Sequence, residues 1–102
     1  MKIDITQKIK GIDGTKALQN SETQKDLTLG DVCINSILAP EEKQSDAKKK
    51  YTDYELFVKL RDATKEVDLS SEEISRIKEK GAVVLGVLVY GQIVDYLEQK
   101  GK

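Results

Sequence analysis

The longest apolar run of the chain lies near its C-terminal end, at Ala82–Leu97, and we expect the rest of the chain to pack around it. Its valines favour a strand. A helical face is indicated by four residues at helical spacing, Leu85, Val89, Ile93 and Tyr96. We favour a helix over residues 84–98, while both alternatives stay open for Ala82–Val89. The run is too short and too polar at its end to cross a bilayer, which requires about 20 apolar residues.

Alternating polar and apolar residues at the N-terminus predict a β-hairpin over residues 1–20. The alternation is clearest at Lys2–Ile5. Asp13-Gly14 is a turn signal, because both central residues of a type I′ turn need positive φ. An isolated two-stranded hairpin is only marginally stable in water. We therefore expect this hairpin to pack on helices or to pair its edge with another segment.

Helical periodicity predicts three further helices, over residues 28–39, 47–65 and 71–80. The pattern thus predicts a mainly α fold of the α+β class, in which the N-terminal β-hairpin is followed by about four helices packed as a small bundle. The 102 residues suffice for a single domain, 1–102, with one core and without metals or disulfides. Residues 99–102 are expected to form a frayed tail.

Local signals mark the ends of two of these helices. Thr28 is an N-cap candidate, and Asp31 would lie near the positive end of the helix dipole. Pro40 is expected to end this helix, since the residue before a proline avoids the α region. Ser70–Glu73 has the pattern of a capping box. Gly81 is predicted to be the C′ residue that ends the later helix.

The helix predicted over residues 47–65 has a narrow polar stripe and a wide apolar surface. The polar positions are Glu55, Lys59, Asp62 and Glu66. Among the apolar positions, the candidate partner-binding residues are Tyr51, Tyr54, Phe57 and Val58. Such a face is either buried against two neighbouring elements or left partly free for a partner, and burial is the favoured interpretation.

The composition argues against most catalytic and metal-binding chemistry. The chain has no histidine, which removes the commonest general base and metal ligand. Its one cysteine, Cys33, falls on an apolar helix face and is expected to be a small buried core residue. The carboxylate pairs Glu41-Glu42 and Glu72-Glu73 are explained by a solvated linker and by helix capping. We therefore predict no catalytic residue, no metal site and no cofactor, and expect that the protein is not an enzyme.

The charges are nearly balanced, with a formal net charge of −1 and both signs mixed along the chain. Such a balance does not favour binding to nucleic acid or to an anionic membrane. The only basic run is made of three residues, Lys48, Lys49 and Lys50. A single cysteine suits a reducing cytoplasm, and Met1–Lys10 lacks the apolar segment of a signal peptide.

Four short segments carry the helix caps and apolar positions of the predicted elements, namely Leu27–Val32, Tyr54–Leu56, Val67–Ser70 and Leu88–Val94. In this order they resemble a group of small, mostly uncharacterised proteins encoded by bacteriophages and prophages. The resemblance implies a phage accessory or assembly protein that binds other proteins. Its expected location is the host cytoplasm, with the virion as the alternative. The resemblance transfers no functional residue to this chain.

The leading hypothesis is a non-enzymatic phage accessory protein that acts by protein–protein interaction. It would serve virion or tail assembly, or inhibit a host protein, and its partner would be a phage structural protein, a host protein or a second copy of itself. Two surfaces motivate this hypothesis, the apolar face of Tyr51–Ala63 and the hairpin edge at Lys2–Leu18. The alternative is a nucleic-acid-associated small regulator that uses Lys48–Lys50 together with Lys43 and Lys59.

Overall fold

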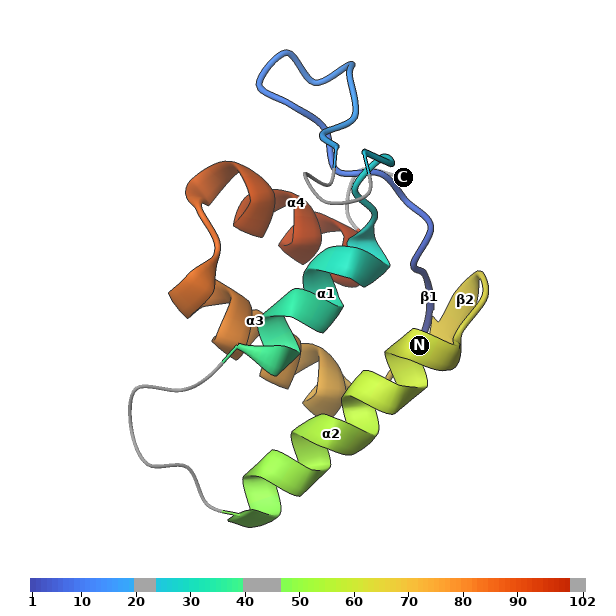
Figure 1. Cartoon of the computed structure of the whole chain (residues 1–102), viewed down its shortest axis with the longest axis vertical. Coiled ribbons are helices and arrows are strands. Elements are labelled where there is room, and N and C mark those ends of the chain that lie inside the picture. The colour runs from blue at the N-terminus through green and yellow to red at the C-terminus, as the bar shows by residue number, and fades with distance from the viewer. Residues whose placement is uncertain (20–23, 40–46, 100–102) are drawn as a thin grey trace.

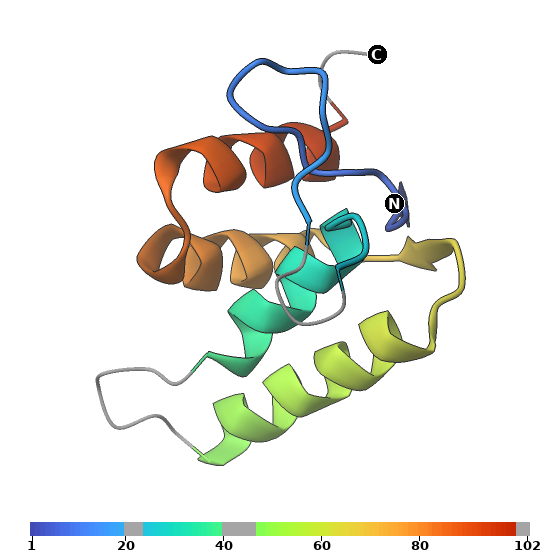
Figure 2. The same cartoon turned by 45° about the horizontal axis from the view of Figure 1, so that its top comes forward.

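The computed structural model describes residues 1–19, 24–39 and 47–99 and confirms the predicted class, a mainly α fold with a two-stranded antiparallel sheet and four helices (Figure 1). The elements are β1 (Lys2–Asp4), α1 (Leu29–Leu38), α2 (Ala47–Asp62), β2 (Glu66–Asp68), α3 (Ser71–Val84) and α4 (Val87–Leu97). In Figure 2, α4 lies above α3, and α1 crosses beside these two helices. α2 forms the edge of the molecule that lies opposite α4.

An aliphatic core joins the four helices and both strands. Its fully buried members come from every part of the chain and include Ile3, Ile9, Leu29, Leu60, Leu69, Ile77, Ile93 and Leu97. Burial of a side chain of this size contributes about 1.5–3 kcal/mol relative to leaving it in water. The core therefore explains how a chain with few aromatic residues can hold four helices together.

The partner of β1 is β2, and not the segment that follows Asp13-Gly14. Ile3 lies opposite Val67 in an antiparallel register, and both side chains enter the core. The N-terminal amine donates to a carboxylate oxygen of Asp68 at 2.8 Å, which fixes the end of the sheet. The sequence pattern predicted that the first strand pairs within residues 1–20. This prediction is wrong for β1, whose partner strand is distant in sequence.

The predicted hairpin is present in part, since Lys10 and Ala17 form an antiparallel bridge on either side of the Asp13-Gly14 turn. This turn is the tip of a loop that stands out from the body (Figure 1). The N–H of Gly11 donates to the carbonyl of Lys16 at 2.8 Å, and Gly14 has φ of 75°. Only Gly14 has positive φ here, so the type I′ turn is not formed. Instead the Asp13 carboxylate accepts hydrogen bonds from the N–H groups of Thr15 and Lys16, and these bonds lower the pKa of Asp13.

The capping box predicted at Ser70–Glu73 is confirmed, and the N-cap predicted at Thr28 is confirmed as part of a second capping box. The Thr28 hydroxyl accepts from the N–H of Asp31 at 3.3 Å, and the Asp31 carboxylate accepts from the N–H of Thr28 at 3.2 Å. Ser70 and Glu73 make the same reciprocal pair at the start of α3, at 3.1 and 2.8 Å. Local sequence therefore fixes where α1 and α3 begin.

The end of α3 differs from the prediction. The helix runs through Gly81 to Val84, so Gly81 is not a C′ residue. Its lack of a side chain serves packing, since a Cβ there would lie 3.2 Å from the Cδ1 atoms of both Ile93 and Leu85. A corner at Leu85 and Gly86, both with extended backbone, separates α3 from α4.

Ala82–Val89 is therefore divided between two helices, with α3 ending at Val84 and α4 beginning at Val87. The helix predicted over residues 84–98 thus begins three residues later than expected. The expectation that the apolar run forms one core element is wrong at this corner, where Val83 and Val87 are exposed. The physical reason is that α4 turns back over α3, so that only the side of the corner that faces the core is buried.

Other predicted boundaries differ by a few residues. α2 ends at Asp62 and not at residue 65, because the chain then turns to place Glu66–Asp68 in the sheet. Gln99 donates through its side chain to the carbonyl of Lys2 at 2.9 Å, so it is anchored. The predictions made for Pro40, Glu41-Glu42, Lys43 and residues 100–102 lie outside the described residues.

Candidate functional site

The most exposed aromatic side chains in the described part of the chain lie on α2. Tyr51 is 63% exposed and Tyr54 is 53% exposed, and their ring centroids are 6.1 Å apart. The ring of Phe57 follows at 6.3 Å from that of Tyr54. Phe57 and Val58 are half-buried, and Phe57 also packs against the core. We call these four residues the α2 stripe.

Full burial of this face, the interpretation favoured by the sequence, is wrong for the two tyrosines. α2 packs mainly against α1, and it does so through Leu56 and Leu60 on the opposite side of the helix. No second element covers Tyr51 and Tyr54 among the described residues. The structure therefore brings the four predicted partner-binding residues together on one continuous and largely solvent-facing surface.

Positive charges flank the α2 stripe at both ends. Lys50, Tyr54 and Arg61 are separated by four and seven residues, which places them on one helical face. The Arg61 guanidinium carbon lies 5.5 Å from the centre of the Phe57 ring, which is the geometry of a cation–π contact. The stripe is thus an aromatic surface with a basic edge at each end.

The lysines of the alternative hypothesis do not form one group. Lys48, Lys49 and Lys50 are exposed in the first turn of α2. The Lys59 ammonium instead contacts a carboxylate oxygen of Glu73 at 2.9 Å, which ties α2 to α3. Lys59 therefore has a structural partner of its own, and the basic surface is limited to the start of α2 and Arg61.

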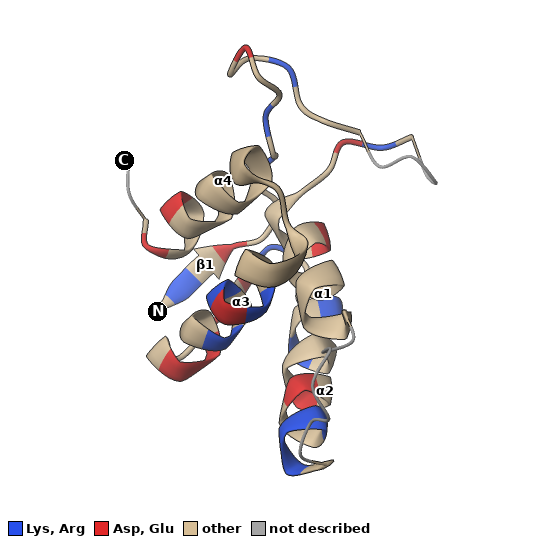
Figure 3. Ribbon diagram, turned by 90° about the vertical axis from the view of Figure 1, so that its left-hand side faces the viewer, with Lys and Arg blue, Asp and Glu red and all other residues tan. Residues whose placement is uncertain are grey.

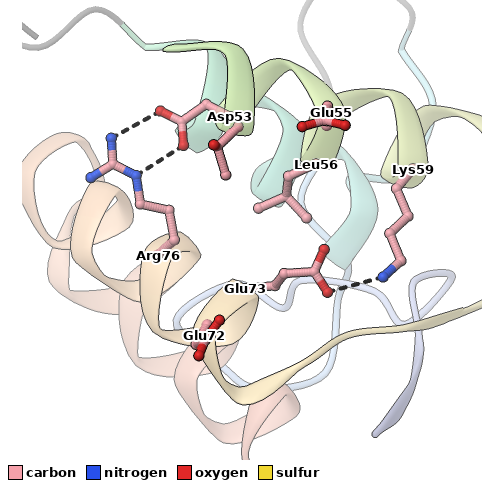
Figure 4. Close-up of a pocket in the computed structure, with 8 residues that line it drawn as sticks. Asp53, Glu55, Leu56, Lys59, Glu72, Glu73 and Arg76 are labelled. Carbon is pink, nitrogen blue, oxygen red and sulfur yellow. Dashed lines mark hydrogen bonds and ion pairs between the residues drawn. The ribbon is translucent and has the colours of Figure 1, made fainter. Parts of the chain in front are cut away.

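A cavity of about 330 Å³ separates α2 from α3 (Figure 4). It is lined by Thr52, Asp53, Glu55, Leu56, Lys59, Glu72, Glu73 and Arg76. Two ion pairs cross it, one between Asp53 and Arg76 and one between Lys59 and Glu73. These pairs tie α2 to α3 across the cavity, while the packing of α2 against α1 positions the helix that carries the α2 stripe.

The Asp53–Arg76 pair is bidentate and largely buried. Both guanidinium–carboxylate contacts are 2.9 Å, and the ammonium of Lys80 lies 3.6 Å from the same carboxylate. Burial alone raises the pKa of Asp53, but the hydrogen bonds and charge of Arg76, followed by those of Lys80, outweigh burial and leave the pKa below its ordinary value. Asp53 is therefore a structural anion and not a general acid.

Lys80 also completes the end of α1. Its ammonium donates to the carbonyl of Ile37 at 2.8 Å, in the last turn of α1. α1 has no basic residue of its own in that turn, so Lys80 supplies the cation that the helix dipole favours there. One buried cluster of three charges thus joins α1, α2 and α3.

This cluster was missed by sequence reasoning, which predicted no contact of Asp53 with Arg76 or Lys80. A signal was present, because Asp53 shares its helical face with Leu56 and Leu60 at positions i+3 and i+7. A carboxylate on a buried face needs a cationic partner. The identity of that partner depended on the packing of α3, which the sequence alone did not specify.

Cysteine and the acidic side chains are the potential metal ligands among the described residues, because the chain has no histidine. No group of three or more Cys, Asp or Glu side chains among them could hold a metal ion. Glu73, one of the carboxylates proposed for helix capping, has a lowered pKa, since the Ser70 N–H and Lys59 outweigh the effect of burial. None of the helices in these ranges is both long and apolar enough to cross a membrane.

We expect the thiol of Cys33 to be unreactive in the folded protein. Cys33 is fully buried in α1, as predicted, and burial raises its pKa to about 12, so almost no thiolate exists at mildly alkaline pH. Labelling by a disulfide reagent should be many-fold slower in buffer than in denaturing urea. Labelling in buffer at the rate of the unfolded chain would contradict the burial of Cys33.

The α2 stripe is the surface on which a function can be argued from exposed aromatic side chains and flanking charge. Comparison of the chain with protein-family models, with curated proteins and with solved structures finds no match in any of the three. Function is therefore proposed from the chemistry of α2 and its surroundings, together with the resemblance noted in the sequence.

Proposed function

We propose that this protein is a non-enzymatic binding module that recognises another protein through the α2 stripe. The observation that carries the proposal is the exposure of Tyr51 and Tyr54 on a helix that is otherwise anchored to the core. Tyrosine and arginine are enriched among the residues that dominate binding energy at protein interfaces. Tyrosine combines a large apolar ring with a polar tip, so it tolerates water before a partner is bound.

The partner chemistry follows from the charges beside the stripe. Lys50 and Arg61 lie on the same face as Tyr54, one toward each end of the stripe. A partner surface with an apolar centre and acidic residues at its edge complements this arrangement. Given the resemblance to phage-encoded proteins, we propose that this partner is a phage structural protein or a host protein, met in the host cytoplasm.

Single-stranded nucleic acid is a second candidate, because exposed aromatic rings next to cations can stack bases and neutralise phosphates. The pairing of Lys59 with Glu73 weighs against it, since this removes one of the predicted phosphate contacts. The two candidates differ in salt dependence, which is steep for binding to phosphates. A gel-shift assay at low salt that shows no retained oligonucleotide would remove the nucleic-acid candidate.

The test is affinity capture with the tagged chain from infected and uninfected bacterial lysates, with Tyr54→Glu as the disrupting variant. We expect the wild-type protein to retain a specific partner protein, and Tyr54→Glu to bind that partner at least about tenfold more weakly. The substitution removes an aromatic anchor and places a negative charge where the proposed partner is acidic. The melting temperature should be nearly unchanged, because Tyr54 is exposed.

Ile12→Glu is the matched control, since Ile12 is 95% exposed on the loop tip and lies outside α2. It introduces the same charge on an apolar exposed position and should leave capture intact. Equal capture by wild type and Tyr54→Glu would show that α2 is not the binding surface. Unfolding of Tyr54→Glu would show instead that this face belongs to the core.

A further inference from the structure

A second exposed surface lies at the corner between α3 and α4, away from the α2 stripe. The chain carries no charged residue between Lys80 and Asp95, and this corner is free of charge in Figure 3. Val87 is 93% exposed and Val83 is 76% exposed. We call five of the exposed residues in this region the corner surface, namely Val83, Val84, Val87, Leu88 and Gly91.

Gly91 is a glycine that the packing of the chain itself does not require. It lies in the middle of α4 on the side opposite the buried Ile93, and a Cβ at Gly91 would have no neighbouring atom within 4 Å. Glycine disfavours a helix relative to alanine. A glycine on an exposed helix face does, however, let the backbone of another helix approach closely.

The two ends of the exposed face of α4 have complementary electrostatic character. α4 begins at Gly86 without a side-chain cap and has no acidic residue in its first turn, whereas α1 and α3 have both. Asp95 is exposed toward the other end and has no partner among the residues that the structure places. Val87 and Asp95 each lie four residues from Gly91, about 6 Å along the helix axis.

We propose that a second copy of this chain covers the corner surface, with the two α4 helices antiparallel and a two-fold axis at Gly91. The symmetry places Asp95 of each copy against the first turn of the other α4, where the helix dipole favours an anion. Val87 and Leu88 of each copy lose their exposure in the same contact. In a symmetric dimer the same patch of both copies is in contact. Because the centre of this patch carries no charge, the two copies do not repel each other there.

A membrane surface fits the same residues less well. Anionic lipids attract lysine and arginine beside the inserted apolar residues. The nearest lysines on α3 are already engaged, Lys78 with Glu98 at 2.7 Å and Lys80 with the carbonyl of Ile37. The corner surface has five residues, far fewer than the roughly 20–30 residues that each partner contributes to a standard interface. We therefore expect a weak dimer that forms at high micromolar concentration.

Sedimentation velocity over a concentration series tests the proposal with the wild type and three variants. Val87→Glu places a carboxylate against Asp95 of the other copy and should raise the dimer dissociation constant about tenfold or more, because like charges repel there. Asp95→Lys should raise it as well, because it places a cation against the partner's helix N-terminus. Gly91→Ala should weaken the dimer while raising the melting temperature of the monomer, two effects that a purely structural role cannot combine.

Tyr54→Lys is the control for this experiment and should leave the dimer intact, so that failure of the α2 proposal and failure of this one are distinguishable. A chain that stays monomeric at all concentrations would overturn the proposal. So would a dimer that survives Val87→Glu, or one that is lost in Tyr54→Lys. Sedimentation of wild type, but not of Val87→Glu, with phosphatidylcholine vesicles would assign the surface to a membrane instead.

Discussion

Replacement of Asp53 by alanine is expected to lower the free energy of unfolding by about 3 kcal/mol. The substitution leaves Arg76 and Lys80 close together and without the carboxylate that both contact at present. Arg76 keeps its contact with the exposed Glu79 at 3.0 Å, but the two largely buried cations lose the anion that lies between them, which costs more than the loss of one hydrogen bond. Since small domains are stable by about 5–15 kcal/mol, this single change removes a large part of the total.

Urea denaturation of wild type and Asp53→Ala measures this loss. The matched control is Asp62→Ala on the same helix, because Asp62 forms an exposed ion pair with Arg61 at 3.0 Å. Exposed pairs of this kind contribute at most about 1 kcal/mol, so Asp62→Ala should be close to wild type. Equal stability of the two variants would refute the buried cluster.

The pH dependence of stability provides an independent readout of the same cluster. The pKa values of Asp53 and Glu73 are lowered in the folded protein. Carboxylates with a lowered folded-state pKa stabilise the fold above their unfolded pKa of about 4, and this stabilisation is lost as the pH falls through the folded value. Asp53→Ala should therefore lose less stability than wild type on acidification.

Those features that depend on neighbours in sequence could be predicted correctly. The capping boxes of Thr28 and Ser70 need only a side chain three residues ahead, so the starts of α1 and α3 followed directly. The burial of Cys33 followed from the spacing of apolar residues on one helix. The mainly α class was confirmed because these local signals cover most of the chain.

Features that depend on segments far apart in sequence could not be obtained in this way. β1 had an apparent partner beyond a good turn signal, yet it pairs with a strand more than sixty positions later. The Asp53–Arg76 pair likewise spans two helices whose relative placement no local pattern encodes. The corner at Leu85 was hidden within an apolar run that favours continuous structure.

The candidate site was predicted in part for the same reason. The residues of the α2 stripe share one helix, so their common face followed from the spacing of Tyr51, Tyr54 and Val58. Their exposure depended on whether another element covers α2, and tertiary packing decided that question. If the proposed dimer forms, each dimer carries two α2 stripes. A partner with repeated subunits could bind both stripes at once, and this avidity would make its binding tighter than binding to one stripe.

Replacement of Ile93 by alanine is the second change with a large expected effect, about 3 kcal/mol of unfolding free energy. Ile93 is fully buried where α4 crosses α3, with its Cδ1 atom against the space left by Gly81. The backbone of α3 forms that wall, so the structure can close the resulting cavity only in part. The more conservative Ile93→Val should cost only about 1 kcal/mol, because one methylene group is removed.

A control variant shows whether the loss of stability in the Ile93 variants comes from core packing or from the removal of apolar atoms as such. Ile12→Ala removes the same atoms at a solvent-exposed position and should change the stability by no more than about 0.5 kcal/mol. Urea denaturation of the three variants gives the comparison directly. A loss for Ile93→Ala below that of Ile93→Val would show that α4 is not docked on α3 through this residue, and the corner surface would then lack the rigid support that the proposed dimer requires.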